Sequence, residues 1–291
     1  MTSTLVYSMW LNDLAASTGN ILFGGIDTAK FTGPLTRLQL YPTKSPSTIN
    51  EFAVKLTSVT AYSKSGSDKL GSTSFPASVV LDSGTTLSFL PSDLVSQIYK
   101  EAGVAVDSDS GTPVVPYSYA RGGGSFAFGF GGANGATINV AMSELVLPVV
   151  GNFTQGPNKG QDACEFGIRA VSSSSDALVL GDTFLSSAFV IYDLVNDEVA
   201  LAQTKFNVTD SNIVAFGSLS ATVPSSTPAP SQAQIADGVV TASPTSYAAA
   251  SAFAVTSAGA RGVRGAGGEA AGVMMAVLVA VGARVLSSII L

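Results

Sequence analysis

In the stretch Ser78-Val79-Val80-Leu81-Asp82-Ser83-Gly84-Thr85-Thr86, a short apolar run ends in an aspartate, and a hydroxyl-Gly-hydroxyl turn follows at once. A β-branched apolar run between breaks predicts a buried strand. Small hydroxyl residues with a glycine are typical of a turn. The stretch therefore predicts one carboxylate at the mouth of a strand, surrounded by groups that donate hydrogen bonds.

The composition excludes several kinds of chemistry. The chain has 291 residues, a net charge of −6, 12% charged residues, no histidine and one cysteine. A Ser-His-Asp triad, a Cys-His pair and a structural zinc site are therefore excluded. No basic patch is present, which argues against a nucleic-acid partner. Acid–base chemistry is left to carboxylates, lysine or tyrosine, and nothing in the sequence indicates a metal or another cofactor.

Residues 1–209 are predicted to form one all-β domain with one or two short helices. A helix is expected after Pro91, ending at Gly103, and a second is expected near Asp182, whose side chain suits an N-cap. Asn196-Asp197 is predicted to be the turn of a hairpin. Runs of β-branched and aromatic residues between Gly, Pro, Asn and Ser breaks predict further strands, among them 5–11, 20–23, 35–41, 52–62 and 126–130.

The tetrapeptide around Asp82 is too short to identify a site by itself, because Asp109-Ser110-Gly111-Thr112 repeats it. The second copy follows Val106-Asp107-Ser108, which is not a buried strand, and Pro113 comes after it. We therefore interpret it as a surface turn between the helix and the next strand.

The order of segments around Asp82 resembles the second lobe of pepsin-like aspartic proteases, especially the fungal GPI-anchored yapsin type. The resemblance runs from about residue 5 to about residue 209. The segments that carry it are Tyr7-Ser8-Met9-Trp10-Leu11, Phe23-Gly24-Gly25-Ile26-Asp27, the turn at Asp82, Leu90-Pro91, Leu178-Val179-Leu180-Gly181 and Val190-Ile191-Tyr192-Asp193.

This resemblance implies a role for each residue of the turn. Asp82 would be the second of two catalytic aspartates that share a proton and hold a water molecule. Ser83 and Thr85 would brace Asp82 and the contact between the two lobes, and Gly84 would leave the Asp82 carboxylate open to water. Thr85 and Thr86 would contact a peptide or protein substrate. Gly181 would support the loop behind Asp82.

The resemblance also implies a first lobe, with its own aspartate, which the sequence does not match. Asp27-Thr28 is followed by Ala29, which breaks the required pattern. The partner implied is thus the missing N-terminal lobe, and the chain alone is expected to be inactive as an aspartic endopeptidase. The alternative function is a non-catalytic protease-like surface module for binding or display. A third idea is self-association of two copies that each supply Asp82.

Cys164 departs from the pattern that the resemblance implies. It matches a position that is normally paired within the second lobe, and the partner should fall near 114–117, where Tyr117 stands. The sequence therefore predicts an unpaired cysteine, either buried as a free thiol or bridging two molecules.

The remaining residues suggest a surface protein. Residues 210–260 are rich in Ser, Thr, Ala and Pro, which predicts a disordered stalk. In 261–291, a spacer and an apolar tail match a GPI-anchor signal, with attachment at Ser257. The rival is a transmembrane helix, in which Arg284 would cost about 2.5–3.5 kcal/mol. Asn152 and Asn207 begin N-glycosylation sequons. These features predict a cell surface or cell wall location, although the first residues do not read as a signal peptide.

Overall fold

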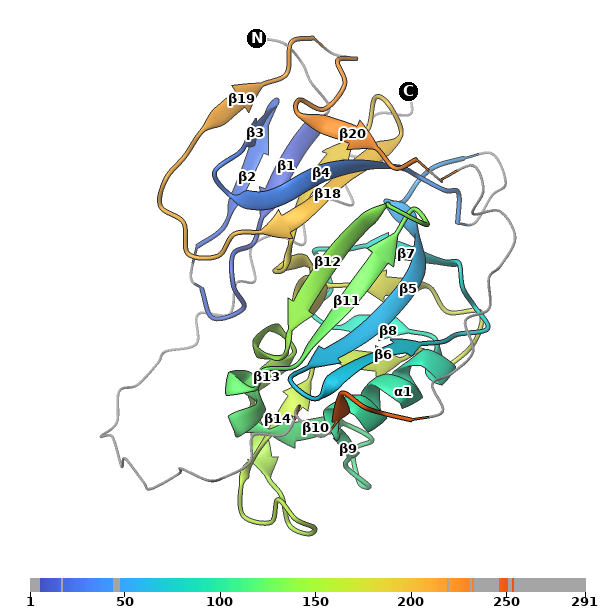
Figure 1. The fold of residues 1–291 in the computed structure, drawn as a ribbon, viewed down its shortest axis with the longest axis vertical. Helices are drawn as coiled ribbons and strands as arrows, with labels where there is room; N and C mark the ends of the chain where they lie inside the picture. Colours follow the sequence, from blue (N-terminus) through green and yellow to red (C-terminus); the bar gives the residue numbers. More distant parts are fainter. Residues whose placement is uncertain are drawn as a thin grey trace. The chain divides into compact units, whose positions relative to one another are not determined.

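The structure is a computed structural model that describes residues 6–16, 18–43, 48–218, 220–230, 232, 246–250 and 253. By its internal contacts the chain divides into residues 1–254 and 255–291, and all described residues belong to the first unit. This unit is built mainly of β-strands (Figure 1), which confirms the predicted all-β class.

The largest sheet of the described residues has eight strands and carries the aspartate turn. Two of its neighbouring pairs, β16 with β7 and β15 with β8, run parallel, although most of its pairs are antiparallel. The sheet order is β12 (Ala136–Ala141), β11 (Ser125–Phe130), β5 (Ala53–Ser63), β7 (Ala77–Leu81), β16 (Leu178–Leu180), β8 (Ser88–Leu90) and β15 (Ile168–Ala170), with β6 (Gly66–Leu70) also paired to β5.

A second sheet of six strands joins the start of the domain to its end. The predicted hairpin at Asn196-Asp197 is confirmed, since it connects β17 and β18. In order, the strands are β2 (Asn20–Phe23), β1 (Val6–Trp10), β17 (Ala188–Asp193), β18 (Glu198–Thr204), β4 (Phe31–Gln39) and β20 (Ser226–Pro228).

Two smaller sheets complete the described part of the fold. One has the order β13 (Val146–Asn152), β14 (Asp162–Phe166), β10 (Pro113–Pro116) and β9 (Ala105–Val106). The other pairs β19 (Ile213–Ala215) with β3 (Gly25–Asp27). Two short 3₁₀ helices are also present, η1 (Tyr117–Arg121) and η2 (Met142–Glu144).

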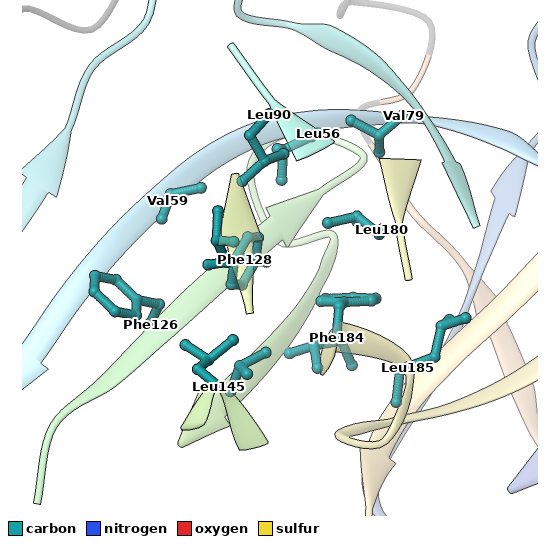
Figure 2. Packing of buried hydrophobic residues seen from close by; sticks show 14 of the residues in the cluster. Leu56, Val59, Val79, Leu90, Phe126, Phe128, Leu145, Leu180, Phe184 and Leu185 are labelled. Carbon is teal, nitrogen blue, oxygen red and sulfur yellow. The ribbon is translucent and has the colours of Figure 1, made fainter. Parts of the chain in front are cut away.

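The alternation of side chains in β11 shows how the sequence builds the main core. Phe126, Phe128 and Phe130 are fully buried, and the Phe128 and Phe130 rings lie edge-on to Phe184 at centroid distances of 5.4 and 5.6 Å. A Cβ on the intervening Gly129 would overlap the Ser58 hydroxyl of β5. Figure 2 shows the same cluster, to which β5, β7, β16 and the helix after β16 contribute side chains. A fully buried side chain of this size contributes roughly 1.5–3 kcal/mol.

The predicted helix after Pro91 is confirmed as α1 (Ser92–Ala102). Pro91 occupies its N-cap, where no backbone N–H is required. Gly103 ends it in the left-handed conformation, with φ of 64°, which glycine adopts without a steric cost. The apolar stripe Leu94, Val95 and Ile98 is buried against the large sheet.

Two segments of the predicted disordered stalk, residues 213–215 and 226–228, form strands instead. β19 pairs with β3, and β20 runs parallel to β4, so 213–228 extend two sheets. Further along, Ala249 and Phe253 are fully buried. Open strand edges supplied the hydrogen-bond partners that composition could not reveal. Residues 233–245 and 254–291, which contain part of the predicted stalk and the whole apolar tail, lie outside the described residues.

Among the helices that the structure describes, none combines the length and the hydropathy needed to cross a bilayer.

Candidate active site

The turn at Asp82 is held at the end of a buried strand. In β7, Val79 and Leu81 are buried in the core, which fixes the direction in which the strand ends. β16 lies parallel to β7 in register with it, and the Asp82 backbone N–H donates a 3.1 Å hydrogen bond to the Leu180 carbonyl oxygen. The aspartate therefore emerges between two strands that are far apart in the sequence.

Both oxygens of the Asp82 carboxylate accept a hydrogen bond. The Gly84 backbone N–H donates to Oδ1 at 2.8 Å, and the Thr85 hydroxyl donates to Oδ2 at 2.7 Å. The carboxylate remains partly exposed, and Ser83, Gly84 and Thr86 have substantial exposure. Each carboxylate oxygen offers about two acceptor sites, so the arrangement leaves sites free for a water molecule.

The prediction that the Ser83 hydroxyl braces Asp82 is not confirmed. The Ser83 side chain is exposed and makes no side-chain hydrogen bond to any residue that the structure describes. Of the two hydroxyls expected to brace Asp82, Thr85 is the one that does so.

Gly181 lies against the back of the aspartate turn. A Cβ at this position would overlap the carbonyl oxygens of Thr85 and Leu87, so only glycine lets β16 approach this closely. Immediately afterwards the Asp182 and Thr183 N–H groups donate to the carbonyl oxygens of Thr85 and Thr86, at 2.9 and 3.1 Å. The loop after β16 thus satisfies the backbone of the turn that carries Asp82.

The second helix predicted near Asp182 is confirmed as α2 (Asp182–Leu185), but the N-cap role predicted for Asp182 is wrong. Asp182 is the first residue of the helix, and the N-cap is Gly181, which has no side chain to cap with. Burial raises the pKa of Asp182 to about 6, and the negative charge of Asp82 adds to this increase. In the sequence, the position of Asp182 directly after the apolar-apolar-Gly run was the signal that it lies close to the Asp82 turn.

A buried group of aromatic residues also lies near the turn. Tyr192 of β17 stacks on Tyr7 with a centroid distance of 4.8 Å and lies edge-on to Phe52 at 4.5 Å. Burial raises the pKa of Tyr192 well above its usual value, and the charges of Tyr7, Asp82 and Asp182 add to this. The Tyr192 hydroxyl finds no hydrogen-bond partner among the described residues. Nothing in the sequence singled out this hydroxyl.

The second copy of the tetrapeptide lies on the surface, as predicted. Asp109 and Ser110 are exposed in the turn between β9 and β10. Here Asp107 is the acceptor: its Oδ1 accepts hydrogen bonds from the backbone N–H groups of both residues and from the Ser110 hydroxyl. No buried strand holds Asp109, so this copy forms only a local turn.

Cys164 is buried in β14, and no disulfide partner is present among the described residues. The residue directly across the ladder in β10 is Val115, which corrects the expectation that Tyr117 stands in the partner position. Tyr117 begins η1 and is half exposed. Burial raises the pKa of the Cys164 thiol, and Asp162 adds to the increase. A thiol of this kind is poorly reactive.

The two sequon asparagines, Asn152 and Asn207, are exposed. The Asn152 amide donates to Asp162, and the Asn207 amide donates to Asp13 at 2.6 Å. Ser257, the expected GPI attachment residue, lies outside the described residues.

Comparison with known proteins agrees with this geometry. The sequence profile of the family described as "Eukaryotic aspartyl protease" matches residues 1–204. Similar relatives include the "Probable aspartic-type endopeptidase opsB" of Aspergillus oryzae, 41% identical over 80% of this chain and 46% of the relative. Another is "Aspartic proteinase 3" of Saccharomyces cerevisiae, 35% identical over 77% of this chain and 36% of the relative.

A solved structure shares the fold. The aspartic proteinase from Irpex lacteus matches 72% of this chain and 60% of its own, with a TM-score of 0.50 and 22% identity. The chain spans about half the length of the opsB relatives it matches. The ordered motifs, the held carboxylate of Asp82 and the profile match over 204 residues agree, and the chain belongs to the eukaryotic aspartyl protease family.

Proposed function

We propose that this chain supplies one of the two catalytic carboxylates of an aspartic-type endopeptidase, and that this carboxylate is Asp82. The observation that carries the proposal is the pair of hydrogen bonds to Asp82, one from a backbone N–H and one from a hydroxyl. They fix both oxygens while leaving the group partly open to water. Such a carboxylate can hold a water molecule against a peptide bond.

A single carboxylate cannot complete the reaction. Peptide hydrolysis by this route needs one carboxylate to take a proton from the water and a second, protonated one to donate to the carbonyl oxygen. Asp182 is not placed for the second role, because its backbone is tied behind the turn, to the Thr85 carbonyl. We infer that the second carboxylate comes from a first lobe, and that the 291-residue chain alone is inactive.

We infer instead that Asp182 keeps the surroundings of Asp82 free of a second negative charge at acidic pH. With its pKa raised to about 6, it is neutral at acidic pH and adds no second negative charge beside Asp82. Thr85 and Thr86 flank the carboxylate, and we assign them contacts with the backbone of a bound peptide. Thr86 is exposed, which leaves its hydroxyl free for such a contact.

The tail and the sequons support a proposal about location. We infer a cell-surface protein of the yapsin type, with N-linked sugars at Asn152 and Asn207 and a GPI anchor at Ser257. Exposure of both asparagines supports the first part. Secretion from a fungal host, followed by deglycosylation and by phospholipase treatment, tests both parts. Retention in the membrane after phospholipase treatment would favour a transmembrane tail instead.

The catalytic proposal is tested by peptide hydrolysis at acidic pH with two proteins. One is the 291-residue chain; the other is the same chain joined to the first lobe of the A. oryzae relative, with which it shares 41% identity. We expect turnover only from the joined protein, and its loss in Asp82→Asn. Asp109→Asn is the matched control, since it makes the same change in an identical tetrapeptide on the surface, and it should retain activity.

Two outcomes would contradict the proposal in different ways. Asp82-dependent turnover by the chain alone would show that it needs no first lobe. Absence of turnover from a folded joined protein would favour the non-catalytic binding or display module.

A further inference from the structure

The chain carries a segment of its own tail on the surface of the lobe. This tail segment consists of Ser246–Ala250 together with Phe253. It lies beside α1 (Figure 1), where the Tyr247 ring is 5.6 Å from the Lys100 Nζ. Ala249 and Phe253 are both fully buried. Two residues from a Ser/Ala-rich stretch are thus buried as completely as the core.

The surface that receives the tail segment is shaped for it at one end by glycines. The loop Gly122–Gly124 and Phe126 surround Phe253, whose ring lies 5.2 Å from that of Phe126. A Cβ on Gly124 would overlap the Phe253 ring, and one on Gly122 would approach the Phe253 carbonyl oxygen to 3.0 Å. Two glycines therefore make the space that the aromatic ring fills.

The backbone of the tail segment is bound by the β5–β6 hairpin. The Ser63 hydroxyl donates to the Ala249 carbonyl oxygen at 2.6 Å, and the Ser65 hydroxyl donates to the Ala248 carbonyl oxygen at 2.7 Å. The Ala249 N–H donates in turn to Asp68 Oδ2 at 2.7 Å, in a buried hydrogen bond. Direct backbone hydrogen bonds of this kind give a docking surface its register.

Asp68 is in contact with a second carboxyl group, that of Glu101 on α1. Glu101 is fully buried, and neither of its oxygens receives a hydrogen bond from a described residue. Its side chain lies against Asp68, so the two carboxyls can form a hydrogen bond only when one of them holds a proton. Two ionised carboxylates in contact and buried would repel each other strongly.

Among the described residues, neither carboxyl of this pair forms a salt bridge with a cation. The basic side chains on the surrounding elements are Lys55 on β5, Lys64 and Lys69 near β6, Lys100 on α1 and Arg121 on η1; Lys55 lies over the Tyr41 ring and the other four are exposed. The other carboxylate of α1, Asp93, accepts hydrogen bonds from Ser72 and Thr73. The tail segment itself contributes no charge, and its one titratable side chain is Tyr247. Burial raises the pKa of Glu101 to about 8, and Asp68 is the charged group that raises it further.

We propose that the tail segment is latched to the lobe by one proton shared between Asp68 and Glu101, held in acidic solution and released in mildly alkaline solution. When Glu101 is protonated it donates to Asp68, whose Oδ2 stays free to accept from Ala249. When Glu101 ionises, the two carboxylates repel each other. Water that enters lowers this repulsion, and it reaches the pair by displacing the tail segment.

The sign of the pH dependence follows from the raised pKa. A docked tail segment that keeps water from the pair favours protonated Glu101, so the latch holds in acid and is lost as the pH rises through about 8. Acidic conditions therefore hold the tail segment against the lobe.

Hydrogen exchange of the Ala249 amide in the full chain tests the latch, because this N–H donates directly to Asp68. After correction for the intrinsic exchange rate, we expect protection at pH 4.5 and at least about a tenfold loss of it at pH 8. Glu101→Gln supplies a permanent donor to Asp68, so protection should become independent of pH. Glu198→Gln, the same change on β18, is the matched control and should behave like the wild type.

Phe253→Ala tests the same docking from the side of the tail, with both carboxyls left in place. Protection of Ala249 should fall at both pH values, while the amide of Phe128 in the core keeps its protection and reports that the lobe is folded. The proposal is overturned by equal protection of Ala249 at both pH values in the wild type. It is also overturned by a Glu101→Gln chain that is folded and still shows the pH dependence of the wild type.

Discussion

The Thr85 hydroxyl donates a 2.7 Å hydrogen bond to Oδ2 of Asp82, and the carbonyl oxygen of the same Thr85 accepts from the N–H of Asp182. Thr85 therefore joins the carboxylate of Asp82 to the loop behind it.

Thr85→Val keeps the shape of the side chain but removes the hydroxyl, so one oxygen of Asp82 loses its donor. A lost hydrogen bond to a charged group costs about 1.5–3 kcal/mol, and partial exposure of Asp82 favours the lower end. Urea unfolding of the chain measures the difference. Thr85→Ser should retain most of the stability, and Thr112→Val, in the surface copy of the tetrapeptide, should change almost nothing. Equal effects of Thr85→Val and Thr112→Val would show that the hydroxyl does not hold Asp82.

Gly181→Ala should destabilise the lobe by about 1–3 kcal/mol, because the new Cβ would overlap the carbonyl oxygens of Thr85 and Leu87. Thermal unfolding measures this. The matched control is Gly151→Ala, where a Cβ would meet nothing within 4 Å. If both variants melt at the same temperature, the close approach of β16 to the turn is not required.

Asp182 should make the stability of the lobe depend on pH. Its pKa in the folded state is raised from 3.8 to about 6, so the folded lobe binds this proton more tightly than the unfolded chain does. The stabilisation is complete below pH 3.8 and is lost as the pH rises through about 6, by at most about 3 kcal/mol. Unfolding free energies measured across this range should fall with increasing pH.

The variant Asp182→Asn should reduce this slope, since the amide does not titrate, and the slope that remains belongs to other carboxyls with a raised pKa, such as Glu101. Asp109→Asn, at an exposed carboxylate, should leave the slope as in the wild type. An unchanged slope in Asp182→Asn would assign the effect to another group.

Val115→Cys should create a disulfide with Cys164, because these residues face each other across the antiparallel β10–β14 pair. Opposite residues in such a ladder have Cα atoms about 4.5–5.5 Å apart, which a disulfide can span. Oxidation should consume both thiols and raise the unfolding free energy by about 2–4 kcal/mol. Tyr117→Cys serves as the control and should keep both thiols free. Two free thiols in oxidised Val115→Cys would mean that the ladder is not in this register.

Local patterns predicted well what depends on local physics. Pro91 and Gly103 mark the ends of α1, and Asn196-Asp197 marks a hairpin, because caps and turns are determined by a few adjacent residues. The apolar run before Asp82 likewise became a buried strand. In each case the residues that determine the structure are neighbours in the chain.

What the sequence could not predict depends on partners that are distant in the chain. The contact of Gly181 with the Asp82 turn arises from a parallel pairing of β7 and β16, which no local pattern reveals. The tail segment comes from a Ser/Ala-rich stretch, and residues distant in the chain, among them Gly122, Gly124 and Asp68, form the surface that binds it. Asp182 was predicted as a cap from its residue type alone, whereas its surroundings raise its pKa.

The parallel pairing of β7 with β16 also has a consequence for synthesis. A ribosome makes the Asp82 turn before β16, so the Leu180 carbonyl and the Asp182 N–H that hold the turn are made later. Closing so long a loop is slow and entropically costly. A growing chain therefore contains Asp82 while the residues up to Asp182 are still being made, and the turn reaches its final geometry only after them.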